Sequence, residues 1–310
     1  MESLNRMATE LVDEAIDFAD ELTVEVHDLE GDAAVLDFGV EVPGALEAGL
    51  LLAEIATAGL ATVGTSLDSV AGAPLTHVEL STDHPALSLL CAGKAGWEVS
   101  VDGFEGLGSG PARALVAEED IFGRIGYRDA SDFAVLALES DALPDAAVAA
   151  HVAERTGVPE SAVFLPTYAT ASHTGSVVAA SRAAELATFR LAELGYDPAA
   201  ILSATGAAPV APVAASEAGA IARTTDALAY GGRVHLTVED EFDRFDEIAS
   251  TAAEEYGRPL EAVFDDAGWA FADLPVEVFA PAQITVDVLG GETYAFGDTH
   301  EAILAESFGL

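Results

Sequence analysis

Basic side chains are scarce in this sequence of 310 residues. Twelve Lys and Arg residues face fifty-four Asp and Glu residues, and Lys94 is the only lysine. With a formal net charge of −42, the chain has no basic patch that could neutralise phosphates, so nucleic acid is not an expected partner. Because 51% of the residues are apolar, a disordered acidic chain is also excluded. The sequence predicts a folded protein with an acidic surface.

Such a surface destabilises a compact fold by self-repulsion unless salt screens it. The screening length is about 8–10 Å at ordinary ionic strength and about 3 Å at 1 M salt. We therefore interpret the charge as an adaptation to a salt-filled cytoplasm, with solvent cations as partners of the surface. Single Asp and Glu residues are expected to be solvated, and the acidic run at 239–247 indicates no catalytic site.

Cysteine is nearly absent as well. Cys91 is alone, which excludes an intrachain disulfide and a multi-cysteine zinc site, and we expect it to be a small buried hydrophobic side chain. The N-terminal segment lacks the apolar core of a signal peptide. The most apolar stretch, 44–64, is interrupted by Glu47 and Glu54, which favours a buried helix and a strand over a membrane span. We expect a cytoplasmic protein without a membrane partner.

Several motifs of known chemistry are missing. The seven histidines form no HxH or HExxH pair, and neither GxxxxGK[ST] nor GxSxG occurs. The run at 106–111, GLGSGP, fails the GxGxxG pattern because Pro111 occupies the place of the third glycine. These absences favour a metal-free protein, and they give no support to a dinucleotide site, a P-loop or the simplest kind of serine hydrolase.

Hydropathy patterns predict an α/β fold with mixed sheets of the α+β type. Apolar residues recur at helical spacing over 2–21, and an alternating pattern over 23–42 is typical of a β-hairpin. From residue 132 onward, short apolar strands alternate with helical segments, including a long helix from about 172 to 194. The length favours two domains. We predict one domain from residues 1–115, completed by 270–310, and a second from residues 116–269.

Two turns combine polar side chains with the start of a helix. In STDHPA, residues 81–86, Asp83 and His84 precede a proline that can open a helix. Lys94 then lies near the C-terminal end of that helix, where the helix dipole favours a cation. In GSGPARAL, residues 108–115, Ser109 lies in a glycine-rich turn, and Arg113 falls in the first helical turn, where a cation is unfavourable unless an anion is near. For each cation the partner is a buried carboxylate or an anionic ligand, and the sequence leaves both open.

Arg182 and Glu185 share a helix face because they are three residues apart. Alanines surround them on both sides, which lets another surface approach closely. From spacing alone, an exposed ion pair is the more common outcome.

Taken together, these segments resemble the methenyltetrahydromethanopterin cyclohydrolase family along nearly the whole chain. The matching stretches are STDHPA (81–86), KAGW (94–97), GSGPARAL (108–115), GSV with the following S-R-x-x-E (181–185), ATGAAPVAPVA (204–214), RTTDALAYGG (223–232), VFAPA (278–282) and ESFGL (306–310). The resemblance implies a two-domain α/β fold with the substrate in a cleft between the domains. It also implies a homo-oligomer, a trimer above all, that needs no metal or other cofactor.

The reaction implied by the resemblance is reversible hydrolysis of an N5,N10-methenyl tetrahydropterin to its N5-formyl form. In the family, the arginine and glutamate of R-x-x-E are the catalytic pair, and they correspond to Arg182 and Glu185. Glu185 would activate water, and Arg182 would favour its charged form and steady the developing oxyanion.

Six further residues are candidates for binding the pterin carrier. Lys94 and Arg113 would anchor its anionic or carbonyl-rich parts, and Asp83 and Thr205 would bind the pterin amide edge. His84 and Ser109 complete the set because they lie in the same motifs.

The sequence leaves the identity of the carrier and two alternative functions open. The carrier is tetrahydromethanopterin or tetrahydrofolate. The chain could also be a non-catalytic protein that binds or channels a one-carbon pterin carrier. A third hypothesis is a metal-free hydrolase or lyase of a phosphorylated small molecule, with Lys94 and Arg113 as phosphate clamps.

Overall fold

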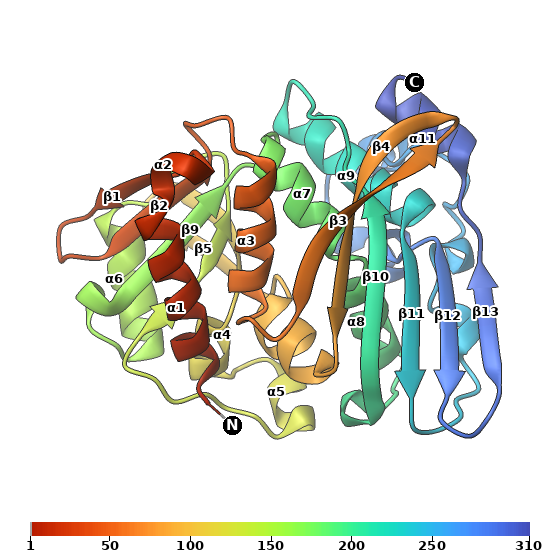
Figure 1. Cartoon of the computed structure of the whole chain (residues 1–310), viewed down its shortest axis with the longest axis horizontal. Helices are drawn as coiled ribbons and strands as arrows, with labels where there is room; N and C mark the ends of the chain where they lie inside the picture. Colours follow the sequence, from red (N-terminus) through yellow and green to blue (C-terminus); the bar gives the residue numbers. More distant parts are fainter. Residues whose placement is uncertain (1) are drawn as a thin grey trace. The chain divides into compact units, whose positions relative to one another are not determined.

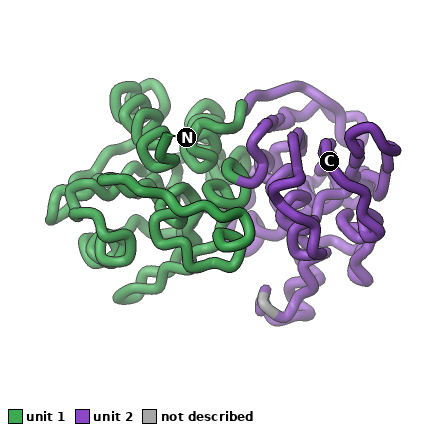
Figure 2. The backbone as a smooth tube through the Cα atoms, turned by 90° about the horizontal axis from the view of Figure 1, so that it is seen from below, with its two compact units in different colours: residues 1–62, 87–178 green, residues 63–86, 179–310 purple. Residues whose placement is uncertain are grey.

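The computed structural model describes residues 2–310 and divides the chain into two compact units (Figure 2). Unit 1 combines the N-terminal segment up to Thr62 with Leu87–Val178, and unit 2 combines Val63–Ala86 with Ala179–Leu310. Each unit contains one mixed sheet with helices. The predicted α/β class with mixed sheets is therefore confirmed.

These units differ from the domains predicted from the sequence, 1–115 with 270–310 and 116–269. The C-terminal segment belongs to unit 2 because the two strands at 283–297 extend the sheet that also holds the strand at 233–238. Residues 116–178 fall in unit 1 because the strand at 163–168 pairs with the strand at 34–39. Such long-range pairing leaves no mark on local hydropathy. The cleft predicted between domains stays a prediction.

Unit 1 is built on a seven-stranded sheet (Figure 1). Its strands are β1 (Glu25–Asp28), β2 (Ala34–Gly39), β5 (Trp97–Val101), β6 (Phe104–Ser109), β7 (Ala134–Val135), β8 (Ala137–Glu139) and β9 (Val163–Tyr168). Its helices are α1 (Leu4–Asp17), α2 (Ala19–Leu22), α3 (Leu46–Ala56), η1 (Ala86–Gly93), α4 (Ala112–Val116), α5 (Asp120–Ile125), α6 (Ala146–Thr156), η2 (Glu160–Ala162) and α7 (His173–Ser181), of which η1 and α7 each cross a unit boundary.

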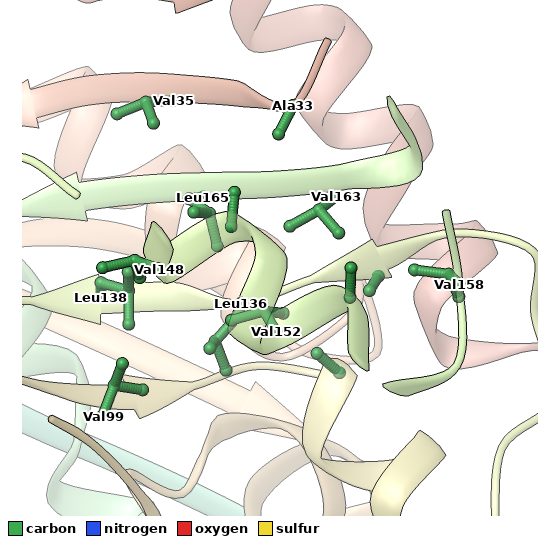
Figure 3. Packing of buried hydrophobic residues seen from close by; sticks show 14 of the residues in the cluster. Ala33, Val35, Val99, Leu136, Leu138, Val148, Val152, Val158, Val163 and Leu165 are labelled. Carbon is green, nitrogen blue, oxygen red and sulfur yellow. The ribbon is translucent and has the colours of Figure 1, made fainter. Parts of the chain in front are cut away.

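The sheet of unit 1 runs in the order β1-β2-β9-β8-β6-β5, with β7 beside β9. Strand β9 is parallel to β2, β7 and β8, and β1, β5 and β6 join by antiparallel pairing. Helix α6 packs against this sheet, and Val148 and Val152 on the helix belong to the same buried cluster as Leu138 on β8 and Leu165 on β9 (Figure 3). These aliphatic side chains are buried because burial of apolar area stabilises the fold by about 25 cal/mol per Å².

Unit 2 is built on a six-stranded sheet in the order β13-β12-β11-β10-β4-β3. Its strands are β3 (Thr62–Val70), β4 (Ala73–Thr82), β10 (Ile201–Pro209), β11 (Arg233–Val238), β12 (Gln283–Val288) and β13 (Thr293–Gly297). Its helices are α8 (Ala183–Glu193), η3 (Pro198–Ala200), α9 (Glu217–Gly231), η4 (Phe245–Glu247), η5 (Ser250–Ala252), α10 (Leu260–Asp266), η6 (Phe271–Asp273), η7 (Val276–Phe279) and α11 (Glu301–Phe308).

In this sheet β11 and β12 run parallel, and β10 pairs antiparallel with both β4 and β11. Helix α8 lies against β10 and β11 (Figure 1). The approach is closest at Gly206, where an added Cβ would lie 2.6 Å from the backbone nitrogen of Ala184. A glycine on β10 therefore lets the first turn of α8 contact the strand directly.

Two helical segments differ from the sequence-based expectation. The single helix predicted from about 172 to 194 is interrupted at Arg182, where the Arg182 N–H donates to the Ala179 carbonyl three residues back. The helix after Pro85 is η1, which has π-type hydrogen bonding; the Lys94 N–H donates to the Leu89 carbonyl five residues back. Hydropathy does not distinguish these helix types. Within residues 2–310, no helix combines the length and hydropathy that a bilayer crossing requires.

Candidate active site

The Arg182–Glu185 pair lies where α8 begins. Arg182 is the residue before the helix, and Glu185 is in its first turn. The guanidinium donates two hydrogen bonds, from Nε to Oε2 of Glu185 at 3.1 Å and from Nη2 to Oε1 at 2.7 Å. This is the paired geometry in which a guanidinium binds a carboxylate most specifically.

Burial distinguishes this pair from an ordinary surface ion pair. The side chains of Arg182 and Glu185 are 18% and 7% exposed, so the outcome expected from spacing alone, an exposed pair, is not what the fold contains. A carboxylate at the start of a helix also interacts favourably with the helix dipole. Low exposure and two hydrogen bonds from Arg182 together hold the Glu185 carboxylate in one position.

The contact between Gly206 and α8 shows on which side of the sheet Thr205 lies. The residues around it on β10 alternate in burial: Ala204 and Gly206 are buried and Thr205 is exposed. Since side chains alternate across a strand and Gly206 contacts Ala184 on α8, Thr205 lies on the opposite face of the sheet from that helix. The structure therefore does not bring Thr205 to the Arg182–Glu185 pair.

Asp83 and His84 follow β4, next to the point where Thr82 pairs with Ala204 of β10. Both side chains are exposed. The turn is held by the Thr82 hydroxyl, which accepts a hydrogen bond from the His84 N–H at 3.0 Å. Asp83 and His84 thus belong to the same unit as the catalytic candidates, and their predicted role in binding stays a prediction.

Lys94, Ser109 and Arg113 lie in unit 1. Ser109 ends β6 and is buried. Gly110 follows with φ +104°, a conformation open to glycine, and turns the chain into α4 as the sequence predicts. Arg113 in α4 is the most deeply buried cation of the site candidates, with a side chain only 1% exposed.

Arg113 caps the end of η1. Its Nη1 donates to the carbonyl of Ala92 at 3.1 Å and more weakly to those of Leu90 and Cys91. The last carbonyls of a helix have no partner within the helix and carry partial negative charge, so a guanidinium here is favourable. Burial raises the pKa of the Cys91 thiol to about 12, which agrees with the predicted role of Cys91 as a buried hydrophobic side chain.

Glu119 is the carboxylate partner of both cations. Its Oε1 accepts from Nε and Nη2 of Arg113 at 2.9 and 2.6 Å, and its Oε2 accepts from Nζ of Lys94 at 2.7 Å. Of the two partners that the sequence left open, the structure thus provides the carboxylate. Sequence reasoning missed Glu119 because it belongs to an acidic surface rich in such residues; the signal available was the missing partner of Arg113.

No group of three or more His, Cys, Asp or Glu side chains that could hold a metal occurs among the described residues 2–310.

Comparison with known proteins supports the family resemblance that these motifs indicated. A family model described as cyclohydrolase (MCH) matches residues 3–308. The methenyltetrahydromethanopterin cyclohydrolase of Halobacterium salinarum is 59% identical over 310 residues, the full length of both chains. The enzymes of the same name from Methanocella arvoryzae and Methanothermobacter marburgensis are 40% and 39% identical, each aligned over 100% of this chain and at least 99% of their own length.

Proposed function

Because the chain belongs to the cyclohydrolase (MCH) family, we propose that it hydrolyses N5,N10-methenyl-tetrahydromethanopterin reversibly to the N5-formyl form. The observation that carries the proposal is the buried, doubly hydrogen-bonded Arg182–Glu185 pair within a chain that matches the family from residue 3 to residue 308. The family resemblance supports a catalytic role for this pair.

The substrate's chemistry suits this pair. The methenyl carbon lies between two nitrogens in a cationic amidinium and is already electrophilic, so hydrolysis requires a placed and activated water. Glu185 takes a proton from that water as its oxygen bonds to the methenyl carbon. When the carbon–N10 bond breaks, N10 receives a proton from Glu185, and the oxygen is left as the formyl carbonyl. One proton is released overall, because the substrate's positive charge is lost.

Arg182 has two tasks in this proposal. Its two hydrogen bonds fix both oxygens of Glu185, so the carboxylate presents one orientation to the water. It would also lie beside the oxygen of the adduct, on which negative charge develops as the remaining hydroxyl proton leaves and the formyl carbonyl forms. General acid–base help contributes about 10²–10⁴-fold, so placement of water and substrate must provide much of the remaining acceleration.

Lys94 is the better candidate of the two cations in unit 1 for binding an anionic or carbonyl-rich part of the carrier. Its side chain is 19% exposed, whereas that of Arg113 is 1% exposed and already binds three carbonyls and Glu119. We propose that Arg113 does not contact the carrier and acts indirectly, by binding the carbonyls at the end of η1. We also propose that Asp83 binds the pterin edge. His84, Ser109 and Thr205 stay predictions of the same kind.

We further propose that the enzyme works in a salt-rich cytoplasm as a homo-oligomer, a trimer by the family resemblance, with cations at its acidic surface. The proposal includes no metal and no separate cofactor. Dialysis against EDTA should leave the rate unchanged, and light scattering in molar KCl measures the oligomer. A rate that falls with EDTA and returns with one divalent metal would contradict the metal-free part.

The test of the activity is a spectrophotometric hydrolysis assay in molar KCl with methenyl-tetrahydromethanopterin and methenyl-tetrahydrofolate. Catalytic loss of the methenyl absorbance with the methanopterin derivative is the expected result. Loss that stops at one equivalent of protein would indicate a binding or channelling protein. A preference for the folate derivative would keep the reaction and change the carrier.

A further inference from the structure

Lys94, Gly96, Arg113 and Glu119 form a compact network at the end of η1 in unit 1. We call these four residues the Glu119 network. Its members come from three segments: the stretch after η1, helix α4, and the residue before α5. Glu119 stands between the two cations, with one oxygen on each.

The two oxygens of Glu119 have different surroundings. Oε1 faces Arg113, whose guanidinium is fixed by the carbonyls of η1 and by the ring of Phe122, 5.5 Å from its centroid. Oε2 faces the more exposed ammonium of Lys94. One end of the carboxylate is thus anchored in the interior, and the other end directs a flexible side chain. Lysine has four methylene groups, and much of its conformational freedom is lost when the ammonium is held.

Gly96 makes room for this arrangement. A Cβ on Gly96 would lie 2.4 Å from Oε2 of Glu119 and 2.9 Å from its carboxyl carbon, so the carboxylate rests directly on the glycine Cα. No unusual φ requires glycine at this position. The glycine of KAGW therefore leaves space for the Glu119 carboxylate, and it is not needed there to form a turn.

From this geometry we infer that Glu119 is a positioning residue, which sets the direction of the Lys94 ammonium for binding an anionic or carbonyl-rich part of the substrate. The inference rests on the proposed function. Glu119 itself does not touch the substrate. Arg113 fixes Glu119, Glu119 fixes Lys94, and Gly96 leaves the space in which this happens.

The variant Glu119→Gln isolates the contact with Lys94. The Gln carbonyl oxygen can still accept from Arg113, while its NH₂ group faces the ammonium and cannot accept from it. We expect KM to rise about tenfold with kcat within about twofold of the unaltered enzyme, because a charge-assisted hydrogen bond that orders Lys94 is lost from ground and transition state alike. If Glu119 acted only through its negative charge, the opposite result is expected. Removing that charge would make the site more attractive to anions and would lower KM.

Glu118→Gln is the matched control. Glu118 is the preceding residue, its side chain is 70% exposed, and it pairs with Arg155 on the surface. The substitution changes the net charge by the same amount within one residue of the test site. KM should stay unchanged in this variant.

Gly96→Ala tests the same contact without changing any charge. The new methyl group displaces the Glu119 carboxylate, and KM should rise as it does in Glu119→Gln. In a Glu119→Ala background there is no carboxylate to displace, so the effect of Gly96→Ala on KM should disappear. Melting temperatures of all variants separate this effect from a loss of fold.

A further readout does not depend on turnover. Because Lys94 is the only lysine, protein labelled with ¹³C-lysine gives a single side-chain Cε–Hε signal. This signal should move in Glu119→Gln and in Gly96→Ala and stay in place in Glu118→Gln.

Three results would overturn the inference: an unmoved lysine signal in Glu119→Gln, a KM equal to that of Glu118→Gln, or a KM that falls. The variant Lys94→Ala separates this inference from the proposed function. An unchanged KM in Lys94→Ala removes Lys94 from substrate binding, and the inference fails while turnover by the unaltered enzyme still supports the proposed function. Absence of turnover in the unaltered enzyme defeats the proposed function itself.

Discussion

At the scale of single residues, the few cations of this chain hold carboxylates in fixed places. Arg113 and Arg182 each bind a carboxylate through two nitrogens. Arg190, 10% exposed, holds Glu277 at 2.6 Å. Exposed ion pairs contribute little and are screened by salt, whereas partly buried pairs are screened much less. Arginines at such positions keep their geometry under the salt conditions that the surface charge requires.

Glu185 gives the most direct catalytic prediction. Glu185→Gln keeps the size of the side chain and an acceptor oxygen for Arg182, but an amide does not take a proton from water. We expect ligand binding to persist and turnover to fall at least about 10²-fold. Comparing kcat with the dissociation constant of the methenyl substrate tests this, and near-normal turnover would exclude Glu185 as the base.

Asp226 gives a prediction of pH dependence. Its carboxyl is 1% exposed, and burial raises its pKa to about 6, although the Leu260 N–H and the Ser307 side chain donate to it and oppose the rise. Nearby Glu261 and Glu306 raise the pKa further. Between the ordinary value of 3.8 and about 6, the folded state binds more protons than the unfolded state, so this carboxyl's contribution to stability is lost as pH rises through that window.

Asp226→Asn should remove this effect. The expected gain is on the order of 3 kcal/mol at pH 8, and it should shrink as the pH is lowered toward 4. Denaturant unfolding of both proteins in the same molar KCl, at pH 4 to 8, measures the difference. A difference that is constant over this range would mean that Asp226 does not titrate with a raised pKa.

At the scale of secondary structure elements, the contact of α8 with β10 decides where the Arg182–Glu185 pair lies. The contact depends on Gly206, because a side chain there would meet the backbone of α8 rather than a movable side chain. If α8 moved away from β10 to make room for a side chain at position 206, its first turn, which carries Glu185, would move as well. Under the proposed function, a change at Gly206 is therefore expected to affect both stability and catalysis.

Gly206→Ala should lower the free energy of unfolding by about 1–3 kcal/mol, as overpacking of a close contact does. It should also lower kcat, because the carboxylate shifts with the helix. Gly72→Ala at the β3–β4 turn, where φ is +82° and no atom lies within 4 Å of an added Cβ, provides a comparison in which stability changes through backbone strain alone and kcat stays normal. Equal kcat in the two variants would show that the α8 position does not limit catalysis.

At the scale of the whole molecule, the charge of −42 predicts that salt stabilises the fold. At about 1 M salt the screening length falls to about 3 Å, so most of the repulsion between surface charges is screened. The 59% identity with the enzyme of Halobacterium salinarum fits a salt-adapted chain.

The melting temperature should rise steeply from about 0.1 M to about 2 M KCl, and most of the rise should occur where the screening length changes most. Sucrose at matched osmolality strengthens burial without screening charge and should give a smaller rise. Calorimetry at each salt concentration measures this. Equal stabilisation by sucrose and by KCl would contradict charge repulsion as the cause.

The sequence by itself determined the acidic surface, the α/β class, the family motifs and the pairing of Arg182 with Glu185. These follow from composition, from hydropathy patterns and from short spacings along the chain, which are local properties. The turn at Gly110 and the cation at the end of the helix after Pro85 were predictable for the same reason.

Only the tertiary structure decided the composition of the two units, the burial of the Arg182–Glu185 pair and the partner of Lys94. Glu119 lies twenty-five residues after Lys94, and β12 joins β11 across forty-four intervening residues. The carbonyl of Ala92 near the end of η1 also accepts a hydrogen bond from Arg113, a residue outside that helix. Contacts of this kind arise from the packing of distant segments, and packing leaves no periodic pattern in the sequence.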